Sequence, residues 1–208
     1  MKRYLPILLP FLLLSCILYT GCGSGGGNLT LNTPITSGQV TITVKDVKTA
    51  KTLEAVDPMK SEFDESGDEI VKKESIKPKN STFLLVIYDL KNTADKNILV
   101  LEPQVRSESG EYYESESANL KVKYEVGLKD IGSFMGGDLK PKELRIGITS
   151  IYDVPDGVLE FGVAKTNYEG SSLEEILKEG FKKGKPDIAW YKMTSLSSPV
   201  EALDIGKD

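Results

Sequence analysis

Histidine is absent from this chain of 208 residues, and its two cysteines, Cys16 and Cys22, both lie near the N-terminus. Without histidine the protein has no Ser-His-Asp or Cys-His catalytic group and no histidine-ligated zinc. It also lacks the commonest general base near neutral pH. Because no thiol follows Cys22, the rest of the chain forms no disulfide and no thiolate metal site. We therefore expect no cofactor, while carboxylate chemistry stays open.

Basic side chains are also scarce, at 26 against 31 acidic ones. Two of the basic residues, Lys2 and Arg3, belong to an N-terminal segment that we expect to be removed. Without them the chain has 24 basic and 31 acidic side chains, a formal charge of −7. Nucleic acid and anionic lipid headgroups attract basic patches, so this balance disfavours both as partners.

The first 21 residues have the order of a secretion signal, with a basic start followed by a long apolar stretch. The alternative is an uncleaved membrane anchor. Residues 5–21 number 17, which is the lower limit for a helix that spans a membrane, and two prolines interrupt them. A cleaved signal peptide over residues 1–21 is therefore the favoured interpretation.

The run Leu18-Tyr19-Thr20-Gly21-Cys22 resembles the lipobox of a prokaryotic lipoprotein, in which the cysteine is acylated and begins the mature chain. The resemblance implies lipidation of Cys22 and attachment through this lipid to the extracytoplasmic face of the cell membrane. Leu13-Leu14-Ser15-Cys16 is a second match, but cleavage there leaves the apolar residues 17–19 at the start of the mature chain. Cleavage before Cys22 leaves glycine and serine, which form a solvated spacer.

Residues 22–37 are rich in Gly, Ser, Thr and Asn, which predicts a flexible tether, and residues 38–195 are predicted to form one domain. Alternating apolar side chains predict its strands. The clearest are residues 40–45, 82–90, 98–105, 111–113, 120–126, 144–151, 158–163 and 188–193. In residues 82–90 the apolar side chains fall on both faces, which predicts a central strand covered on both sides.

Three segments depart from this strand pattern. Residues 57–81 are charged and weakly apolar and are predicted to form a mobile excursion. Ser172 and Glu175 form a capping box that opens a predicted helix over residues 172–183. Residues 196–208 are predicted to be a loose C-terminal tail. Short strands with regular turns and no strand–helix alternation predict a mainly β fold, an immunoglobulin-like antiparallel β-sandwich with one added C-terminal helix.

Three motifs carry a family resemblance. The apolar run of residues 83–90 ends in Lys91-Asn92-Thr93, residues 138–144 resemble a Leu-x-Pro-Gly-Glu turn, and residues 151–155 resemble a Phe-Asp-Val-Pro strand ending. Together they resemble the immunoglobulin-like domain-of-unknown-function family that is common in prokaryotic surface lipoproteins and is grouped with a secreted mycobacterial antigen. The resemblance covers residues 38–165 and implies no catalytic residues. Lys142 stands where the family usually has glycine.

The densest acidic cluster is residues 64–69, on a predicted loop. Asp64, Asp68 and Glu69 are its weak candidates for a cation, because hard cations such as calcium take six to eight oxygen ligands. The cluster lacks the spacing of an EF-hand. A solvated loop is the favoured interpretation, and no metal is expected.

Aromatic residues offer a candidate binding surface for sugar or peptide, as rigid, partly polar contact area. The candidates are Tyr112, Tyr113, Trp190 and Tyr191, with Tyr124 beside them. The alternative is that these side chains cover the core of the sandwich.

Glutamates at positions 108, 111, 114 and 116 surround a predicted hairpin turn. Two carboxylates held about 5 to 10 Å apart are able to hydrolyse a glycosidic bond, but near-alternating glutamates are typical of a solvated hairpin. We expect a membrane-anchored surface lipoprotein that is a non-catalytic binding module for an unknown protein or envelope ligand. The alternatives are a carboxylate-based envelope hydrolase and an accessory solute-capture lipoprotein.

Overall fold

The computed structural model describes residues 27–57, 60, 62–70, 72–124, 138–165, 167–184, 187–194 and 198–205. The predicted signal peptide, Cys16 and Cys22 lie outside these residues. The described chain is mostly β-strand, and most of its strand pairs are antiparallel. The predicted antiparallel β-sandwich is confirmed, with two helices instead of the single expected one.

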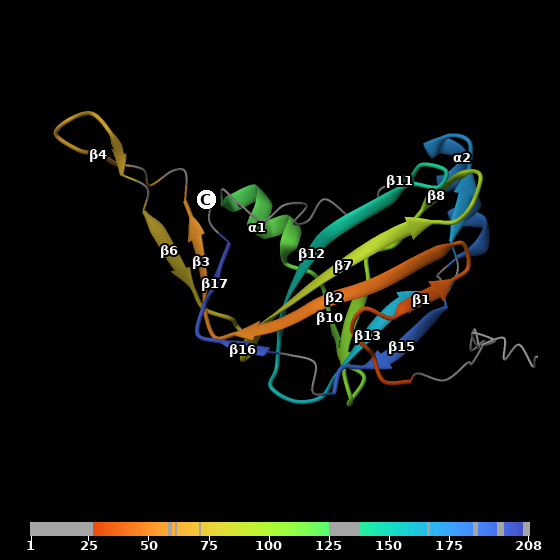
Figure 1. Cartoon of the computed structure of the whole chain (residues 1–208), viewed down its shortest axis with the longest axis horizontal. Coiled ribbons are helices and arrows are strands. Elements are labelled where there is room, and N and C mark those ends of the chain that lie inside the picture. Colours follow the sequence, from red (N-terminus) through yellow and green to blue (C-terminus); the bar gives the residue numbers. More distant parts are fainter. Residues whose placement is uncertain are drawn as a thin grey trace, which may run out of the picture.

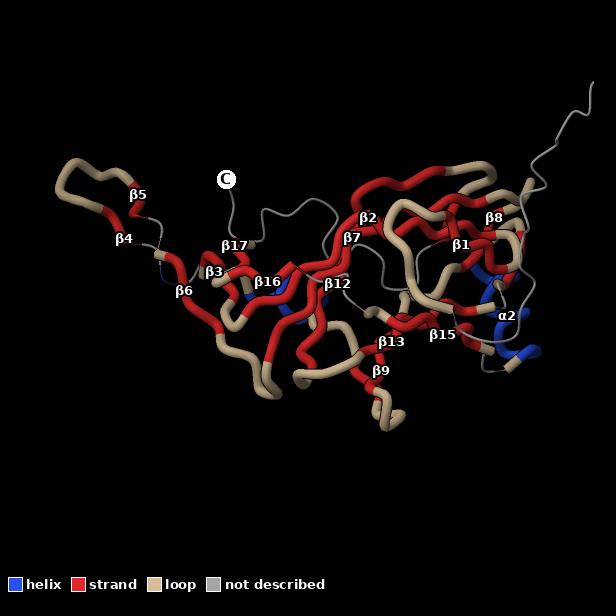
Figure 2. The backbone as a smooth tube through the Cα atoms, turned by 60° about the horizontal axis from the view of Figure 1, so that its bottom comes forward, coloured by secondary structure: helices blue, strands red, loops and turns tan. Residues whose placement is uncertain are grey.

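Two facing sheets form the sandwich. We call them the long sheet, of order β1-β2-β7-β12 with β16 paired to β2, and the short sheet, of order β10-β9-β13-β15. The long sheet contains β1 (Pro34–Ser37), β2 (Val40–Ala50), β7 (Thr82–Asn92), β12 (Leu144–Val154) and β16 (Ser198–Val200). The short sheet contains β9 (Gln104–Ser107), β10 (Tyr112–Tyr113), β13 (Leu159–Ala164) and β15 (Ile188–Lys192). Figure 2 shows β2 and β7 in one layer and β13 and β15 in the other.

Side-chain alternation along β7 produces two cores. Leu84, Val86 and Tyr88 point between the two sheets, where the rings of Tyr88 and Phe161 meet edge to face at 6.4 Å. The side chain of Leu85 points to the opposite face, into a second core. Both faces of β7 are therefore buried, as expected for a central strand.

The second core is covered by α1 (Ser117–Lys123) and a small satellite sheet of order β17-β3-β6 (Figure 1). The satellite strands are β3 (Leu53–Val56), β6 (Lys73–Ile76) and β17 (Leu203–Asp204). The long sheet contributes Phe83, Leu85 and Ile151 to this core. Because β7 and β12 contribute side chains to both cores, the two cores lie on opposite faces of the long sheet.

The predicted strand over residues 120–126 is wrong for residues 120–123, which end α1, and residues 125 and 126 lie outside the described residues. Leu120 and Tyr124 are both buried in the second core, whereas Val122 between them is 90% exposed. Residues four apart lie on the same face of a helix, and they also lie on the same face of a strand. The helix therefore buries Leu120 and Tyr124 together, as a strand would. The Ser117 hydroxyl, which accepts from the Ile151 amide at 2.9 Å, fixes the helix to β12.

The predicted tether over residues 22–37 extends too far along the sequence, because residues 28–37 belong to the fold. Asn28 forms an isolated bridge to Lys192, and Leu29 is buried in the core between the sheets. Residues 34–37 then form β1, an edge strand on β2. Leu29, Leu31 and Ile35 are spaced among polar residues and pack in or against the core. Their apolar pattern, rather than the linker-like composition of the segment, therefore decides that it joins the fold.

The predicted loose tail is also wrong for residues 198–205. β16 pairs in parallel with β2, and β17 pairs in parallel with β3. Leu203 and Ile205 are buried in the second core. Burial of these two side chains offsets the conformational entropy lost by ordering the segment.

Residues 57–81 contain β6 and a separate hairpin, so the predicted excursion is only partly irregular. The hairpin strands β4 (Glu62–Phe63) and β5 (Glu69–Ile70) pair with each other and with no other strand of the described chain. In Figure 1 the hairpin lies at the end of the molecule farthest from β15.

The predicted strand over residues 98–105 is split, because its two halves join different sheets. β8 (Asn97–Leu99) lies in a small sheet of order β11-β8-β14, with β11 (Asp138–Leu139) and β14 (Tyr168–Gly170), whereas β9 lies in the short sheet. Pro103 interrupts the run between them and has no amide hydrogen to donate. The helix α2 (Leu173–Lys183) covers this small sheet through Ile176, and the Ser172 hydroxyl caps its start by accepting from the Glu175 amide.

Candidate functional site

The outer face of the short sheet brings together two of the aromatic residues that the sequence singled out, Tyr112 and Trp190. In a strand, neighbouring side chains point to opposite faces, so each of the four strands gives one set to the core and one to the outside. Val105, Tyr113 and Phe161 point into the core. Arg106, Tyr112 and Trp190 point outward, and we call these three residues the aromatic platform.

Trp190 reaches from β15 across β13 at the one position where the sheet has no side chain. A Cβ atom on Gly162 would lie 2.5 Å from Cζ3 of the indole ring, so only glycine permits this approach. The Tyr112 ring meets the indole edge to face, with centroids 5.6 Å apart. The guanidinium carbon of Arg106 lies 4.1 Å from the indole centroid, which is a cation–π contact.

Two ion pairs neutralise the charges on and beside the platform. Arg106 Nε donates to Glu160 Oε2 at 2.6 Å across the β9–β13 pair. Lys192 Nζ lies 3.3 Å from Glu108 Oε1. Arg106 is therefore held by a carboxylate as well as by the indole, and it presents a fixed orientation to solvent.

The four aromatic candidates are thus divided by strand alternation. Tyr112, 59% exposed, and Trp190 come together on the platform. Tyr113 is buried, and Tyr191 packs against the core. The Tyr113 hydroxyl donates a hydrogen bond to the Glu111 carboxylate at 2.9 Å. Burial, and then this hydrogen bond, raise the pKa of Tyr113. The alternative interpretation, that these side chains cover a core, is therefore correct for Tyr113 and Tyr191. It is also correct for Tyr124, which lies in the second core.

The sequence analysis missed Arg106 and Gly162. Arg106 alternates with the buried Val105 in β9, so the outward direction of its side chain was readable once that strand was recognised. Gly162 is a glycine within an apolar strand, which often marks a close approach of another group. Neither signal reveals that an indole from β15 covers the glycine, because that contact depends on strand order.

The acidic cluster forms the turn of the β4–β5 hairpin. Asp64 Oδ1 accepts from the amides of Ser66 and Asp68, at 2.8 and 2.9 Å, and from the Ser66 hydroxyl at 2.6 Å. The Ser66 hydroxyl, followed by these amides, lowers the pKa of Asp64. Glu69 lies in β5. Among the described residues, no three His, Cys, Asp or Glu are grouped so as to hold a metal ion.

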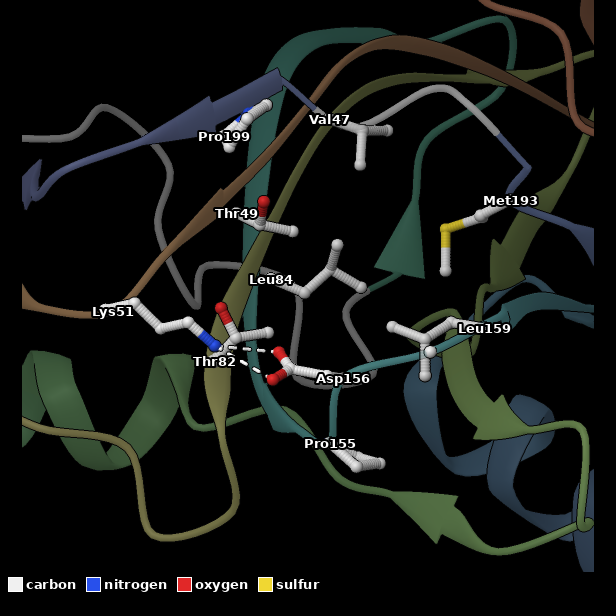
Figure 3. Close-up of a pocket in the computed structure, with 11 residues that line it drawn as sticks. Val47, Thr49, Lys51, Thr82, Leu84, Pro155, Asp156, Leu159, Met193 and Pro199 are labelled. Atoms are coloured by element: carbon white, nitrogen blue, oxygen red, sulfur yellow. Dashed lines mark hydrogen bonds and ion pairs between the residues drawn. The ribbon is translucent and has the colours of Figure 1, made fainter.

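A hollow of about 300 Å³ opens between the two sheets beside the turn that joins β12 to β13 (Figure 3). Its apolar lining includes Leu84, Leu159 and Met193. Lys51 and Asp156 form an ion pair of 2.8 Å at its rim, as the dashed lines in Figure 3 show. The pair is mostly exposed and contributes little stability.

A second hollow, of about 420 Å³, lies on the other side of the same turn and brings together Glu108, Glu111 and Asp156. Each of these carboxylates has a partner. Glu108 contacts Lys192, Glu111 accepts from the Tyr113 hydroxyl, and Asp156 pairs with Lys51. Of the four glutamates expected around the hairpin turn, Glu108 and Glu111 line this hollow, whereas Glu114 and Glu116 do not.

A polar cluster lies inside the sandwich. The hydroxyls of Tyr88 and Ser150 are 3.1 Å apart, and the Ser150 hydroxyl donates to Glu102 Oε1 at 2.8 Å. Burial raises the pKa of Glu102, and the hydrogen bonds from Ser150 and Ser115 oppose this shift. Burial also raises the pKa values of Tyr88 and Tyr152. This cluster stands apart from the platform and from both hollows.

The family-like motifs have structural roles. The fully buried Asn92 donates through Nδ2 to the carbonyl oxygens of Lys96, Leu139 and Lys140, which joins the end of β7 to the 138–144 turn. Asp153 accepts from the amides of Lys79 and Asn80 and so holds the chain that enters β7. These residues lie away from the platform.

Comparison with known proteins finds no family model that matches this chain. It also finds no matching curated protein. Solved structures with similar folds include the yjhA protein of Bacillus subtilis, with 12% identity, 78% of this chain and 97% of that chain covered, and a TM-score of 0.43. Another is an uncharacterized beta-sandwich protein of Clostridium difficile, with 14% identity, coverage of 81% and 95%, and a TM-score of 0.41.

A further similar structure is ycdA of Bacillus subtilis, described as "a putative lipoprotein", with 13% identity and a TM-score of 0.40. The match covers 79% of this chain and 38% of that one. The sheets described above, rather than these distant likenesses, define the class as a β-sandwich protein. In the part of the chain that the structure describes, no helix is long and apolar enough to cross a membrane.

Proposed function

We propose that this protein is a non-catalytic interaction module, held at the extracytoplasmic face of the membrane by an acylated Cys22. The observation that carries the interaction role is the aromatic platform. Its exposed tyrosine, oriented arginine and indole lie together on the outer face of the short sheet. Aromatic and arginine side chains contribute much of the binding energy at protein interfaces.

The anchor is supported by the leader and by the lipobox resemblance. Mass spectrometry of the native protein should find a mature chain that begins at Cys22 and carries acyl chains. Detection of an intact Met1 would contradict cleavage, and acylation at Cys16 would move the attachment site.

The interaction role is tested by site-specific crosslinking on intact cells. A photo-reactive residue at Tyr112 should form adducts with an envelope component, whereas one at Phe63, on the distant β4–β5 hairpin, serves as the control. Equal labelling from both positions, or none from Tyr112, would refute the platform as the interaction surface.

A carboxylate-based hydrolase is the second candidate, and the observation that favours it is the hollow lined by Glu108 and Glu111. Glycan hydrolysis needs one carboxylic acid and one carboxylate on either side of the bond. Turnover of an envelope polymer that is lost in Glu111→Gln would establish the hydrolase. No turnover, with binding lost in Tyr112→Ser, would establish the interaction module.

Solute capture is less well supported. Capture between lobes requires two units that close on a ligand, whereas the two cores described here share the strands β7 and β12.

A further inference from the structure

The first described residues attach to the short sheet at its β15 edge. The Leu29 amide donates to the Lys192 carbonyl at 2.8 Å, and the Lys192 amide donates to the Gly27 carbonyl at 3.0 Å. Asn28 therefore lies beside Lys192 as one more strand residue, in parallel orientation. The chain from the N-terminus thus enters the fold at the edge of the sheet that carries the platform.

The chain between this edge and the proposed anchor is short. Cys22 and Gly27 are five residues apart in the sequence, so their Cα atoms are at most about 18 Å apart even in a fully extended chain. Neighbouring strands lie about 4.8 Å apart and strand residues advance about 3.3 Å each, which places the Trp190 backbone within about 10 Å of Asn28. An acylated Cys22 therefore keeps the platform near the membrane surface.

We propose that the partner of the aromatic platform is the phospholipid headgroup layer of the membrane that holds the anchor. This inference rests on the acylated Cys22 of the proposed function. Trp and Tyr side chains are enriched at the headgroup level of membranes, because their rings are apolar and their N–H and O–H groups are polar. The platform offers one of each beside a stacked guanidinium.

The negative charge of the chain does not oppose this contact. Arg106 is paired with Glu160 and Lys192 with Glu108, so the charges nearest the platform cancel. Exposed charges farther away than about 8 Å are largely screened at physiological ionic strength. Because the lipid already holds the domain at the surface, a weak contact is sufficient to orient it.

The exposed aromatic side chain of Phe63 provides a matched comparison. It is 70% exposed on the β4–β5 hairpin, at the other end of the molecule from β15 (Figure 1). The hairpin lies far from β9, β13 and β15 (Figure 2), so Phe63 is distant from a membrane that the platform contacts. Tyr112→Glu and Phe63→Glu therefore both replace an exposed aromatic ring with a carboxylate, at two sites far apart.

The test uses Trp190 as its probe, because it is the only tryptophan of the chain. The full mature protein, with acylation of Cys22 verified by mass spectrometry, is reconstituted in phosphatidylcholine vesicles with and without a lipid that carries a nitroxide on its headgroup. We expect the nitroxide to quench Trp190 emission in the native protein and in Phe63→Glu. Quenching should be clearly weaker in Tyr112→Glu, or in Tyr112→Ser if the glutamate variant does not fold.

Two results would overturn the inference. Equal emission with and without nitroxide, in acylated protein, would show that the platform faces away from the membrane and is free for a glycan or a protein. Equal quenching of all variants would show that the short connection alone, and not the platform, keeps Trp190 near the lipid. If Cys22 itself carries no acyl group, the anchor of the proposed function fails and this inference fails with it.

Discussion

Gly162 is the residue on which the platform depends, because a side chain there would collide with the indole of Trp190. We expect Gly162→Ala to displace the indole, to break its contact with Arg106 and to shift Trp190 emission to longer wavelength. Overpacking of this kind costs about 1 to 3 kcal/mol of stability. Fluorescence and urea denaturation measure the two effects.

Gly180 gives the control for that substitution. It lies inside α2, where a Cβ would meet the Tyr168 ring at an ordinary 3.6 Å. Gly180→Ala should therefore raise stability, by up to about 1 kcal/mol, because alanine is the better helix former. A Gly162→Ala protein as stable as the native one, with unchanged emission, would contradict the close approach.

Lys142 has a φ of 59°, a left-handed conformation that favours glycine. Its Nζ donates to the Thr93 carbonyl and pairs with Asp95. Lys142→Gly and Lys142→Ala lose the same two contacts, but only glycine also removes the backbone strain. We expect the glycine variant to be more stable than the alanine variant by about 1 kcal/mol in urea denaturation. Equal stabilities would contradict the strain.

Glu102 predicts a pH dependence. Burial raises its pKa, so the folded protein binds the proton more tightly than the unfolded chain does. Its contribution to stability therefore falls as the pH rises from the ordinary glutamate range, about 4.3, through the higher pKa of the folded state. Glu102→Gln removes this loss and keeps an acceptor for the Ser150 hydroxyl. The free energy of unfolding of the variant, relative to that of the native protein, should increase with pH in this range. If the two free energies change with pH in parallel, the raised pKa of Glu102 is contradicted.

At the scale of elements, the sequence predicts strands well where apolar side chains alternate or form a short continuous run, as in β2, β7, β12, β13 and β15. The prediction fails where the same residues match both the helical period and the strand period. Leu120 and Tyr124 match both a strand and a helix, and the choice depends on the second core, which the sequence does not reveal. The division of Tyr112 and Tyr113 between the outside and the core was likewise readable from alternation, whereas the contact with Trp190 was not.

The C-terminal strands are the other element that composition concealed. Ile205 is fully buried in the second core, and its amide donates to the Glu54 carbonyl at 2.8 Å. Ile205→Ala should therefore lower stability by about 2 to 4 kcal/mol, because it removes buried side-chain volume. Thermal or urea denaturation measures the loss, and the exposed Glu201→Ala serves as the control. Equal stability of the two variants would restore the interpretation of residues 196–208 as a loose tail.

At the scale of the whole molecule, the β4–β5 hairpin lies beyond the satellite sheet, far from the strands that carry the platform (Figure 1). The central strands of the long sheet run from the satellite sheet toward α2, and β7 among them is buried on both faces. The hairpin, which pairs only with itself among the described strands, is the part whose loss should disturb the two cores least.

The pairing of Asn28 with Lys192 has a consequence for the order in which the protein is made. The segment that enters the fold first in the sequence has to wait for β15, which is among the last segments to be synthesised. β2 and β3 wait longer still, for β16 and β17. Neither the sandwich nor its satellite sheet is complete until residues 198–204 have been made, so a chain in the course of synthesis still has open strand edges.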